Sequence, residues 1–291
     1  MTHHFETVDV FTDRRFGGNP LAVFPDAQGL TAEEMQSLSA ELNLSETVFV
    51  LPPADPANTA RMRIFNRTAE MPFAGHPSIG TAYILARHGN AETEMRFEVP
   101  AGLVRVTVTR NAEGEPTGGR LIAPRPLATR ETVAPEAIAA CLGLTPADIR
   151  TAAHAPLAMS VGVEFFAVEV APDALARCVP DIAAFRAALQ PWMDGRLSLF
   201  TYTRSGEKIR ARMFAPLAGT IEDAATGSAS AALGALLLSL DGSDRAAFAV
   251  TQGVEMGRPS LLQVEAERTG EGIIASVGGN CVPMFEGKIS R

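Results

Sequence analysis

Two short loops carry the residues whose types and spacing point most directly to chemistry. Gly75-His76-Pro77 leads into the apolar segment 78–87, and Gly227-Ser228 leads into the apolar segment 229–240. A helix start has unpaired backbone N–H groups and a partial positive charge, so it attracts anions, and glycine lets a ligand approach closely. Two such starts facing each other would hold a small carboxylate. A single loop of this kind more often only caps a helix, and a single histidine such as His76 is more often a core residue. The occurrence of two such loops in one chain favours a ligand-binding site.

Two acidic residues are candidates for proton transfer beside these loops. Asp223 either favours the helix start electrostatically or acts as a hydrogen-bond partner or auxiliary base for His76. Glu46 precedes the apolar strand 47–50. If its carboxyl faces an apolar pocket, desolvation raises its pKa and equips it to give and take protons near neutrality. The alternative is a solvated carboxylate at the end of a strand.

The loops belong to an internal repeat that covers much of the chain. Residues 61–65 resemble 210–214, residues 70–78 resemble 222–230, and residues 97–102 resemble 248–253, with an alternating strand after each of the last pair. The matches keep their order, which indicates a duplicated half rather than a solenoid. Independent strand–turn–helix composition is the weaker explanation. His76 and Ser228 then occupy equivalent places.

The boundary between the halves is expected at 124–132, where Pro124 and Pro126 punctuate the chain. This gives an N-terminal domain of residues 1–126 and a C-terminal domain of residues 127–291, with a last strand that can cross back to the first domain. A helix is predicted over 131–142, with Thr132 as N-cap and Pro135 near the first turn. Another, ending at 37–43, begins with the capping pattern of residues 31–34.

The remaining pattern predicts an α+β fold. The segments after the two loops are apolar nearly all round, which is typical of a helix enclosed on all sides. Alternating segments predict half-buried antiparallel strands, among them 7–11, 47–51, 62–65, 165–170 and 197–203. We therefore expect two pseudo-symmetric domains, each a curled antiparallel sheet around one central helix.

Composition excludes several classes of protein. The chain has 291 residues, 46% of them hydrophobic, and a net charge of −8, which disfavours a nucleic-acid partner. The longest apolar run, 231–238, is too short to span a membrane. Three cysteines without a CxxC motif and no visible signal peptide indicate a cytoplasmic protein. The five histidines lack metal-ligand spacing, and nucleotide-binding and GxSxG motifs are missing, so neither a metal, a nucleotide cofactor nor an acyl-enzyme at Ser228 is expected.

Several motifs resemble the PhzF (phenazine biosynthesis) family over essentially the whole chain. They lie at residues 8–11, 18–23, 45–47, 72–77, 222–223, 225–229, 252–253 and 257–259. The resemblance implies a diaminopimelate epimerase-like fold with the site between its halves, a homodimer, and a cofactor-free isomerisation like that of trans-2,3-dihydro-3-hydroxyanthranilate.

The same resemblance implies roles for individual residues. Glu46 matches the acid/base, and His76, Asp223 and Ser228 match the other active-site residues. The related epimerases use two thiols at the paired loop positions, whereas this chain has His76 and Ser228 there, which disfavours thiol chemistry. The loop backbones would hold the substrate carboxylate, and the residues assigned to substrate binding are Asn19, Gly75, Pro77, Thr226 and Gly227.

Together these features predict a cofactor-independent isomerase that moves a proton between carbons of a small amino or hydroxy carboxylate, with one glutamate as acid and base. The alternative is a non-catalytic protein that binds a small carboxylate on the same fold. The complete set of proton-transfer residues favours the enzyme. Substrate identity would depend on residues outside the shared motifs.

Overall fold

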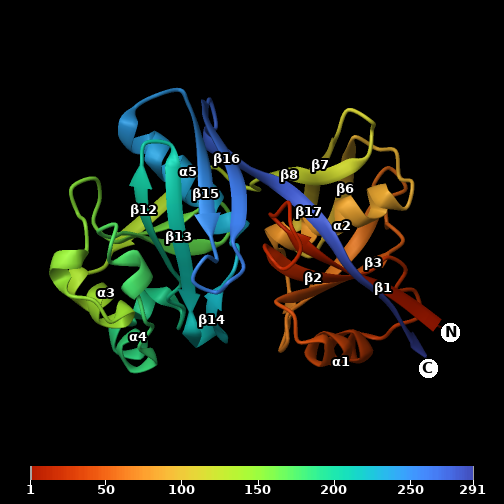
Figure 1. Cartoon of the computed structure of the whole chain (residues 1–291), viewed down its shortest axis with the longest axis horizontal. Helices are drawn as coiled ribbons and strands as arrows, with labels where there is room; N and C mark the ends of the chain where they lie inside the picture. The colour runs from red at the N-terminus through yellow and green to blue at the C-terminus, as the bar shows by residue number, and fades with distance from the viewer. Residues whose placement is uncertain (1, 291) are drawn as a thin grey trace. The chain divides into compact units, whose positions relative to one another are not determined.

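The computed structural model describes residues 2–290, which divide into two units (Figure 1). Unit 1 runs to Ile122 and resumes from Gly278, and unit 2 is Ala123–Val277. The last strand, β17 (Gly272–Ser290), therefore contributes residues to both units. Within residues 2–290, no helix is long and apolar enough to cross a membrane.

The strands of unit 1 form a closed ring. β17 pairs with β1 at one end of the strand series and with β8 at the other, and the strands between pair in succession. Most pairs are antiparallel, while β2–β3 and β4–β6 are parallel because a helix crosses between the partners. The strands are β1 (Thr2–Val10), β2 (Asn19–Phe24), β3 (Glu46–Leu51), β4 (Ala60–Phe65), β5 (Glu70–Met71), β6 (Glu94–Val99), β7 (Gly102–Arg110) and β8 (Pro116–Ile122).

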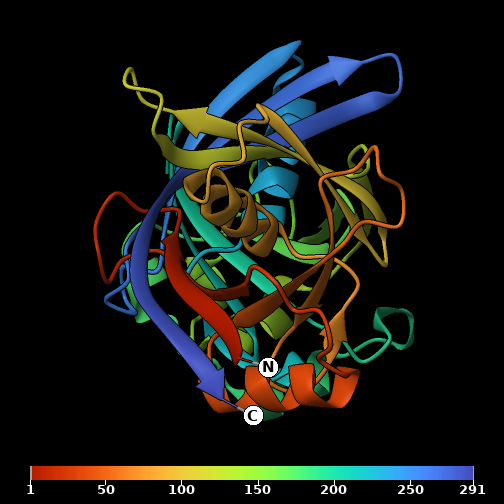
Figure 2. The same ribbon diagram turned by 90° about the vertical axis from the view of Figure 1, so that its right-hand side faces the viewer.

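Helix α2 (Gly75–Arg87) lies inside this ring, as Figure 2 shows for the coil in the centre of the strands. Every residue from Gly75 to Ile84 is buried. A Cβ at Gly80 would come 2.5 Å from Leu21 Cδ2, so the helix approaches β2 too closely for any larger residue there. The helix is apolar all round because strands contact it on several sides, as the sequence predicted.

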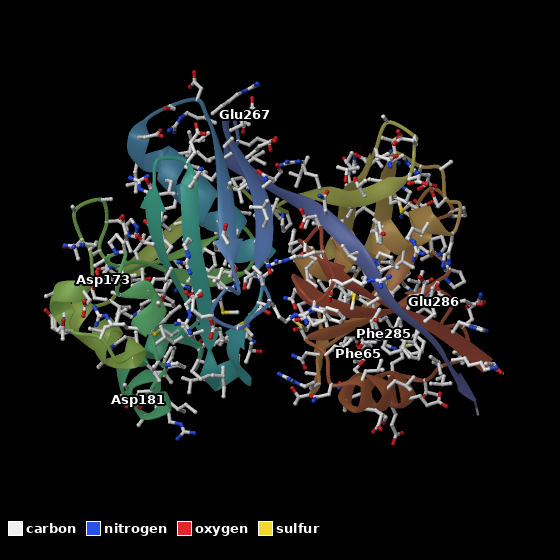
Figure 3. All side chains as sticks on the ribbon, viewed as in Figure 1. Phe65, Asp173, Asp181, Glu267, Phe285 and Glu286 are labelled. Atoms are coloured by element: carbon white, nitrogen blue, oxygen red, sulfur yellow. The ribbon has the colours of Figure 1, made fainter. Side chains whose placement is uncertain are left out.

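Helix α1 (Ala32–Leu42) packs on the outer face of unit 1. Thr31 and Glu34 form the predicted capping box, and Asn43 ends the helix in the left-handed region. Below the helix, the Phe24 and Phe49 rings stack with centroids 4.8 Å apart, and Phe65, labelled in Figure 3, meets Phe49 edge-on. This aromatic cluster fixes the strands that carry Glu46 and Arg63.

Unit 2 repeats the central part of unit 1. β13 (Lys208–Ala215), β14 (Thr220–Asp223), α5 (Gly227–Asp241), β15 (Arg245–Gln252) and β16 (Ser260–Thr269) follow in the order of β4, β5, α2, β6 and β7. The pairing is also repeated, with β13–β15 parallel and the β13–β14 and β15–β16 pairs antiparallel. Helix α5 is buried from Ala229 to Leu238 and contacts strands of its own unit.

The rest of unit 2 extends this sheet and covers it. β9 (Ala128–Thr132), β10 (Leu157–Ser160) and β11 (Glu164–Glu169) pair antiparallel, and β11 runs parallel to β12 (Leu199–Ser205), which pairs with β13. Helices α3 (Pro135–Leu142) and α4 (Ile182–Ala188) pack on an apolar core. Short 3₁₀ turns lie at Pro146–Asp148, Leu175–Arg177, Pro191–Met193 and Pro216–Ala218.

One helix start differs from the prediction. Helix α3 begins at Pro135 rather than at Glu131, and its N-cap is Ala134 rather than Thr132. Thr132 instead ends β9, where it is the register partner of Leu157 in β10. A strand pairing with a distant segment outweighs the local capping preference of a threonine. The proline at the first helical position is as expected.

Candidate functional site

Glu46 and His76 lie against each other in unit 1. The Glu46 Oε2 atom is 3.1 Å from His76 Nε2, and their side chains are 16% and 7% exposed. Glu46 is the first residue of β3, which pairs in parallel with β2, and His76 lies in the first turn of the enclosed helix α2. A carboxylate and an imidazole in contact, both largely shielded from water, are suited to proton transfer.

Asn19 supports the other side of the imidazole. Its Nδ2 atom is 3.4 Å from His76 Nδ1, and its Oδ1 accepts a hydrogen bond of 2.9 Å from the Ser45 hydroxyl. Asn19 begins β2 and is fully buried. Ser45 and Glu46 are neighbours in the chain, so one short segment contributes to both sides of His76.

Burial determines the charge of His76. Desolvation lowers the pKa of His76 from its ordinary value of 6.5 to about 3. The imidazole is therefore neutral near neutral pH, with one nitrogen that donates and one that accepts.

The first turn of α2 has no side-chain cap. Its N-cap is Ala74, and the turn consists of Gly75, His76 and Pro77, all buried. The first N–H groups of a helix have no partner within the helix, and with the helix dipole they favour an anion. Proline at this position costs no hydrogen bond.

In unit 2 the loop before α5 is held by Gln252, the last residue of β15. The Gln252 Oε1 atom accepts from the Thr226 N–H at 3.0 Å, and its Nε2 donates to the Asp223 carbonyl at 2.8 Å and to Thr226 Oγ1 at 3.1 Å. The Thr226 hydroxyl in turn donates to Asp223 Oδ2 at 2.6 Å. A buried amide thus fixes the hydroxyl that orients the Asp223 carboxylate.

A close approach of the backbone makes this arrangement possible. Gly253 has φ +73°, and a Cβ there would come 2.5 Å from the Arg258 carbonyl oxygen and 2.6 Å from that of Ala224. Only glycine fits, so the chain can turn directly after Gln252 and lie against the loop. Gly227 and Ser228 begin α5, Gly227 buried and Ser228 half-buried.

An arginine–glutamate pair precedes each loop. Arg212 donates to both carboxylate oxygens of Glu222, each at 2.8 Å, and to the carbonyls of Leu175 and Cys178 at 3.1 and 2.9 Å. The equivalent pair in unit 1 is Arg63 with Glu70, at 2.7 and 2.6 Å. In both units the guanidinium lies over the phenylalanine two residues further on, Phe214 or Phe65.

The structure therefore groups the predicted site residues within each unit. Glu46, His76, Asn19, Gly75 and Pro77 belong to unit 1, whereas Asp223, Thr226, Gly227 and Ser228 belong to unit 2. The assigned roles of these residues stay predictions.

Ser45 and Gln252 lie in motifs that carry the family resemblance and Arg212 lies in the internal repeat, but the sequence assigned a role to none of the three. Gln252 and Arg212 are polar side chains at buried positions of strands. A polar residue at an inward position of an alternating strand is a signal that could have identified Gln252.

The cysteine thiols take no part in these groups. Cys141, Cys178 and Cys281 are free and buried. Burial raises the pKa of Cys141 and of Cys178 to about 11 and raises that of Cys281 further. Thiols that stay protonated are poor nucleophiles and bases.

Comparison with known proteins identifies the family. The model of the family described as phenazine biosynthesis-like protein matches residues 8–287. Trans-2,3-dihydro-3-hydroxyanthranilate isomerase of Pseudomonas aeruginosa is 35% identical over 303 residues, which cover 98% of this chain and 99% of that protein.

Solved structures agree. The crystal structure of a PhzF-family phenazine biosynthesis protein of Bacillus anthracis has a TM-score of 0.88 at 26% identity and covers 100% of both chains. A hydroxyproline epimerase of Agrobacterium vitis, with a TM-score of 0.66 at 14% identity and coverage of 99% and 92%, shares the fold alone. The predicted α+β epimerase-like fold and the isomerase class are confirmed. The chain belongs to the PhzF family of phenazine biosynthesis-like proteins and is an isomerase.

Proposed function

We propose that this protein is a cofactor-independent isomerase that moves a proton between carbons of a small amino- or hydroxy-bearing carboxylate, with Glu46 as the single acid and base. The observation that supports this is the shielded Glu46 carboxylate, 3.1 Å from the ring of a neutral His76. The P. aeruginosa relative is named for an isomerisation of trans-2,3-dihydro-3-hydroxyanthranilate, which is a compound of this class.

The reaction needs two proton transfers through one group. The Glu46 carboxylate takes a proton from one carbon of the substrate, and the electron pair of the broken C–H bond stays on the substrate as a delocalised anion. The resulting carboxylic acid returns the proton to another carbon. Positioned donors that face the developing charge lower the barrier, and a neutral His76 can serve as one of them.

The remaining predicted residues would bind and orient the substrate. In this proposal each helix start is suited to bind a carboxylate through its N–H groups, that of α2 around Gly75 with Pro77 and that of α5 around Gly227 with Thr226. Asp223 and Ser228 are the proposed active-site residues of unit 2. We expect Asp223→Asn and Ser228→Ala to lower kcat or raise KM, each measured with the folded variant.

Glu46→Gln tests the central claim, since glutamine keeps the size of the side chain but cannot transfer a proton. In ²H₂O, wild-type protein should introduce deuterium into trans-2,3-dihydro-3-hydroxyanthranilate or another cyclic amino or hydroxy acid of a test panel. We expect Glu46→Gln to lose about 10²–10⁴-fold of this rate. The control is Glu286→Gln, an exposed glutamate on β17 labelled in Figure 3, which should keep full activity.

The same experiment separates the enzyme from a carboxylate-binding protein. Deuterium uptake that persists in a folded Glu46→Gln protein would show that another group carries the proton. A panel compound that binds to the wild-type protein without any uptake of deuterium would contradict the isomerisation and support the binding protein.

We further propose a cytoplasmic homodimer. The location is supported by three cysteines that are all free, as expected in a reducing compartment, and the homodimer by the family resemblance. Light scattering coupled to size-exclusion chromatography tests the dimer, which a monomeric mass at micromolar concentration would contradict.

A further inference from the structure

The hydrogen bonds around His76 determine which of its ring nitrogens carries the proton. Asn19 presents its Nδ2 group, which can only donate, to His76 Nδ1 at 3.4 Å. Its Oδ1 accepts from the Ser45 hydroxyl at 2.9 Å, which favours this orientation of the amide. Nδ1 must then offer a lone pair, and in a neutral imidazole the proton lies on Nε2.

The other side of the ring agrees with this assignment. Nε2 lies 3.1 Å from Glu46 Oε2. The two atoms do not meet in hydrogen-bond geometry, but a proton on Nε2 places positive charge beside the carboxylate. An inverted Asn19 amide would require the proton on Nδ1 and would leave the unprotonated Nε2 in contact with the carboxylate oxygen.

We infer that Asn19 is a positioning residue, which holds His76 as the Nε2–H tautomer so that the proton lies on the side of the ring next to Glu46. This inference rests on the proposed function for its catalytic meaning, although the tautomer itself can be measured without any substrate. Asn19 acts through His76, in addition to any contact with the substrate.

The backbone fixes Asn19 in this position. Gly18 has φ +64°, and a Cβ there would come 2.3 Å from the Val10 carbonyl oxygen, so only glycine allows this approach to β1. Asn19 is then the register partner of Val10 and is fully buried. A buried amide held by two elements loses little further freedom when it orients the imidazole.

Long-range ¹H–¹⁵N spectra of the histidine rings test the tautomer directly. At neutral pH we expect the His76 ring to show a protonated Nε2 and an unprotonated Nδ1. His154 serves as an internal reference for the other tautomer, because its Nδ1 lies 2.8 Å from the Ala155 carbonyl oxygen. Because a carbonyl only accepts, the His154 ring should carry its proton on Nδ1.

Asn19→Asp changes the partner of Nδ1 from a donor to an acceptor. The His76 proton should then move to Nδ1, or a second proton should bind there. In either case kcat should fall by roughly 10²-fold or more with KM little changed, because the ring no longer presents a neutral Nε2–H donor to the reacting centre. The control is Asn280→Asp, which introduces the same charge at an exposed side chain and should leave both the spectrum and the activity as in the wild type.

A wild-type His76 ring with its proton on Nδ1, or on both nitrogens at neutral pH, would overturn the inference, even if Asn19→Asp does not fold. An Nε2–H tautomer that persists in Asn19→Asp would also overturn it. These results are distinct from a failure of the proposed function. If Glu46→Gln stays active while His76 is the Nε2–H tautomer, the proton-transfer role of Glu46 fails and the tautomer assignment stands.

Discussion

Removal of Arg212 should destabilise the protein far more than removal of its counterpart Arg63. The two arginines make the same bidentate pair with a glutamate and lie over the same type of ring. Their surroundings differ, because the side chains of Arg212 and Glu222 are 8% and 15% exposed, whereas those of Arg63 and Glu70 are 27% and 33% exposed. Arg212 also satisfies two carbonyls.

The magnitudes follow from solvent access. Arg212→Ala leaves the Glu222 carboxylate and two carbonyl groups without their donor at a site that is largely shielded from water. Breaking such a buried ion pair lowers the free energy of unfolding by about 3–5 kcal/mol. Arg63→Ala breaks a pair that water can solvate and screen, which costs about 0.2–1 kcal/mol. At about 2–4 °C per kcal/mol for a domain of this size, the melting temperature should fall by roughly 6 °C or more for Arg212→Ala and by at most about 4 °C for Arg63→Ala.

Scanning calorimetry of the two variants beside the wild type measures both effects. Arg212→Lys should rescue little, because an ammonium group cannot reproduce the bidentate contact. Since Glu222 directly precedes Asp223, we also expect Arg212→Ala to lower kcat in the fraction that remains folded. Equal losses of melting temperature for Arg212→Ala and Arg63→Ala would refute the argument from burial.

Two further predictions concern acid stability and a backbone turn. Because burial lowers the pKa of His76 to about 3, the unfolded chain binds up to one more proton at this residue than the folded chain between about pH 6.5 and 3. Stability should therefore fall as the pH drops from about 6.5 toward 3, by up to about 1.4 kcal/mol per pH unit, and urea unfolding of His76→Gln should show a shallower slope. Gly253→Ala should unfold at clearly lower temperature than Gly219→Ala, because both have positive φ but only Gly253 has carbonyl oxygens within 2.6 Å of the added Cβ; equal melting temperatures would contradict this.

The sequence predicted those features that depend on local pattern. The capping box at Thr31 and Glu34 is formed by residues three apart, so it is visible without a fold. The helices after the two loops are apolar all round, and that pattern indicated that each is enclosed. The internal repeat predicted that both units contain the same order of strands and helix. It was visible because a repeated strand–helix–strand segment keeps its hydrophobic residues and glycines at equivalent positions.

Features that depend on distant partners were not predictable in this way. Thr132 has the properties of an N-cap, but its pairing with β10 makes it part of a strand. Arg212 lies in a strand with alternating character, and nothing local indicates that two carbonyls from residues 175 and 178 would bury its guanidinium. The contact of Asn19 with His76 joins residues 57 positions apart, and it depends on how helix α2 packs against strand β2.

The two units use the duplicated scaffold differently. In each, a buried amide orients a group that can bind or carry a proton: Asn19 acts on His76, and Gln252 acts through Thr226 on Asp223. The two amides do not occupy equivalent positions of the repeat. Asn19 precedes the repeated segment, whereas Gln252 lies within it, and the equivalent residue of the first half is Ala101. The duplication thus accounts for two similar helix starts but not for the proton chemistry, which each half acquired through residues of its own. Substitution of a loop residue by its counterpart from the other half should therefore not transfer that residue's role, since the amide that orients it would be missing.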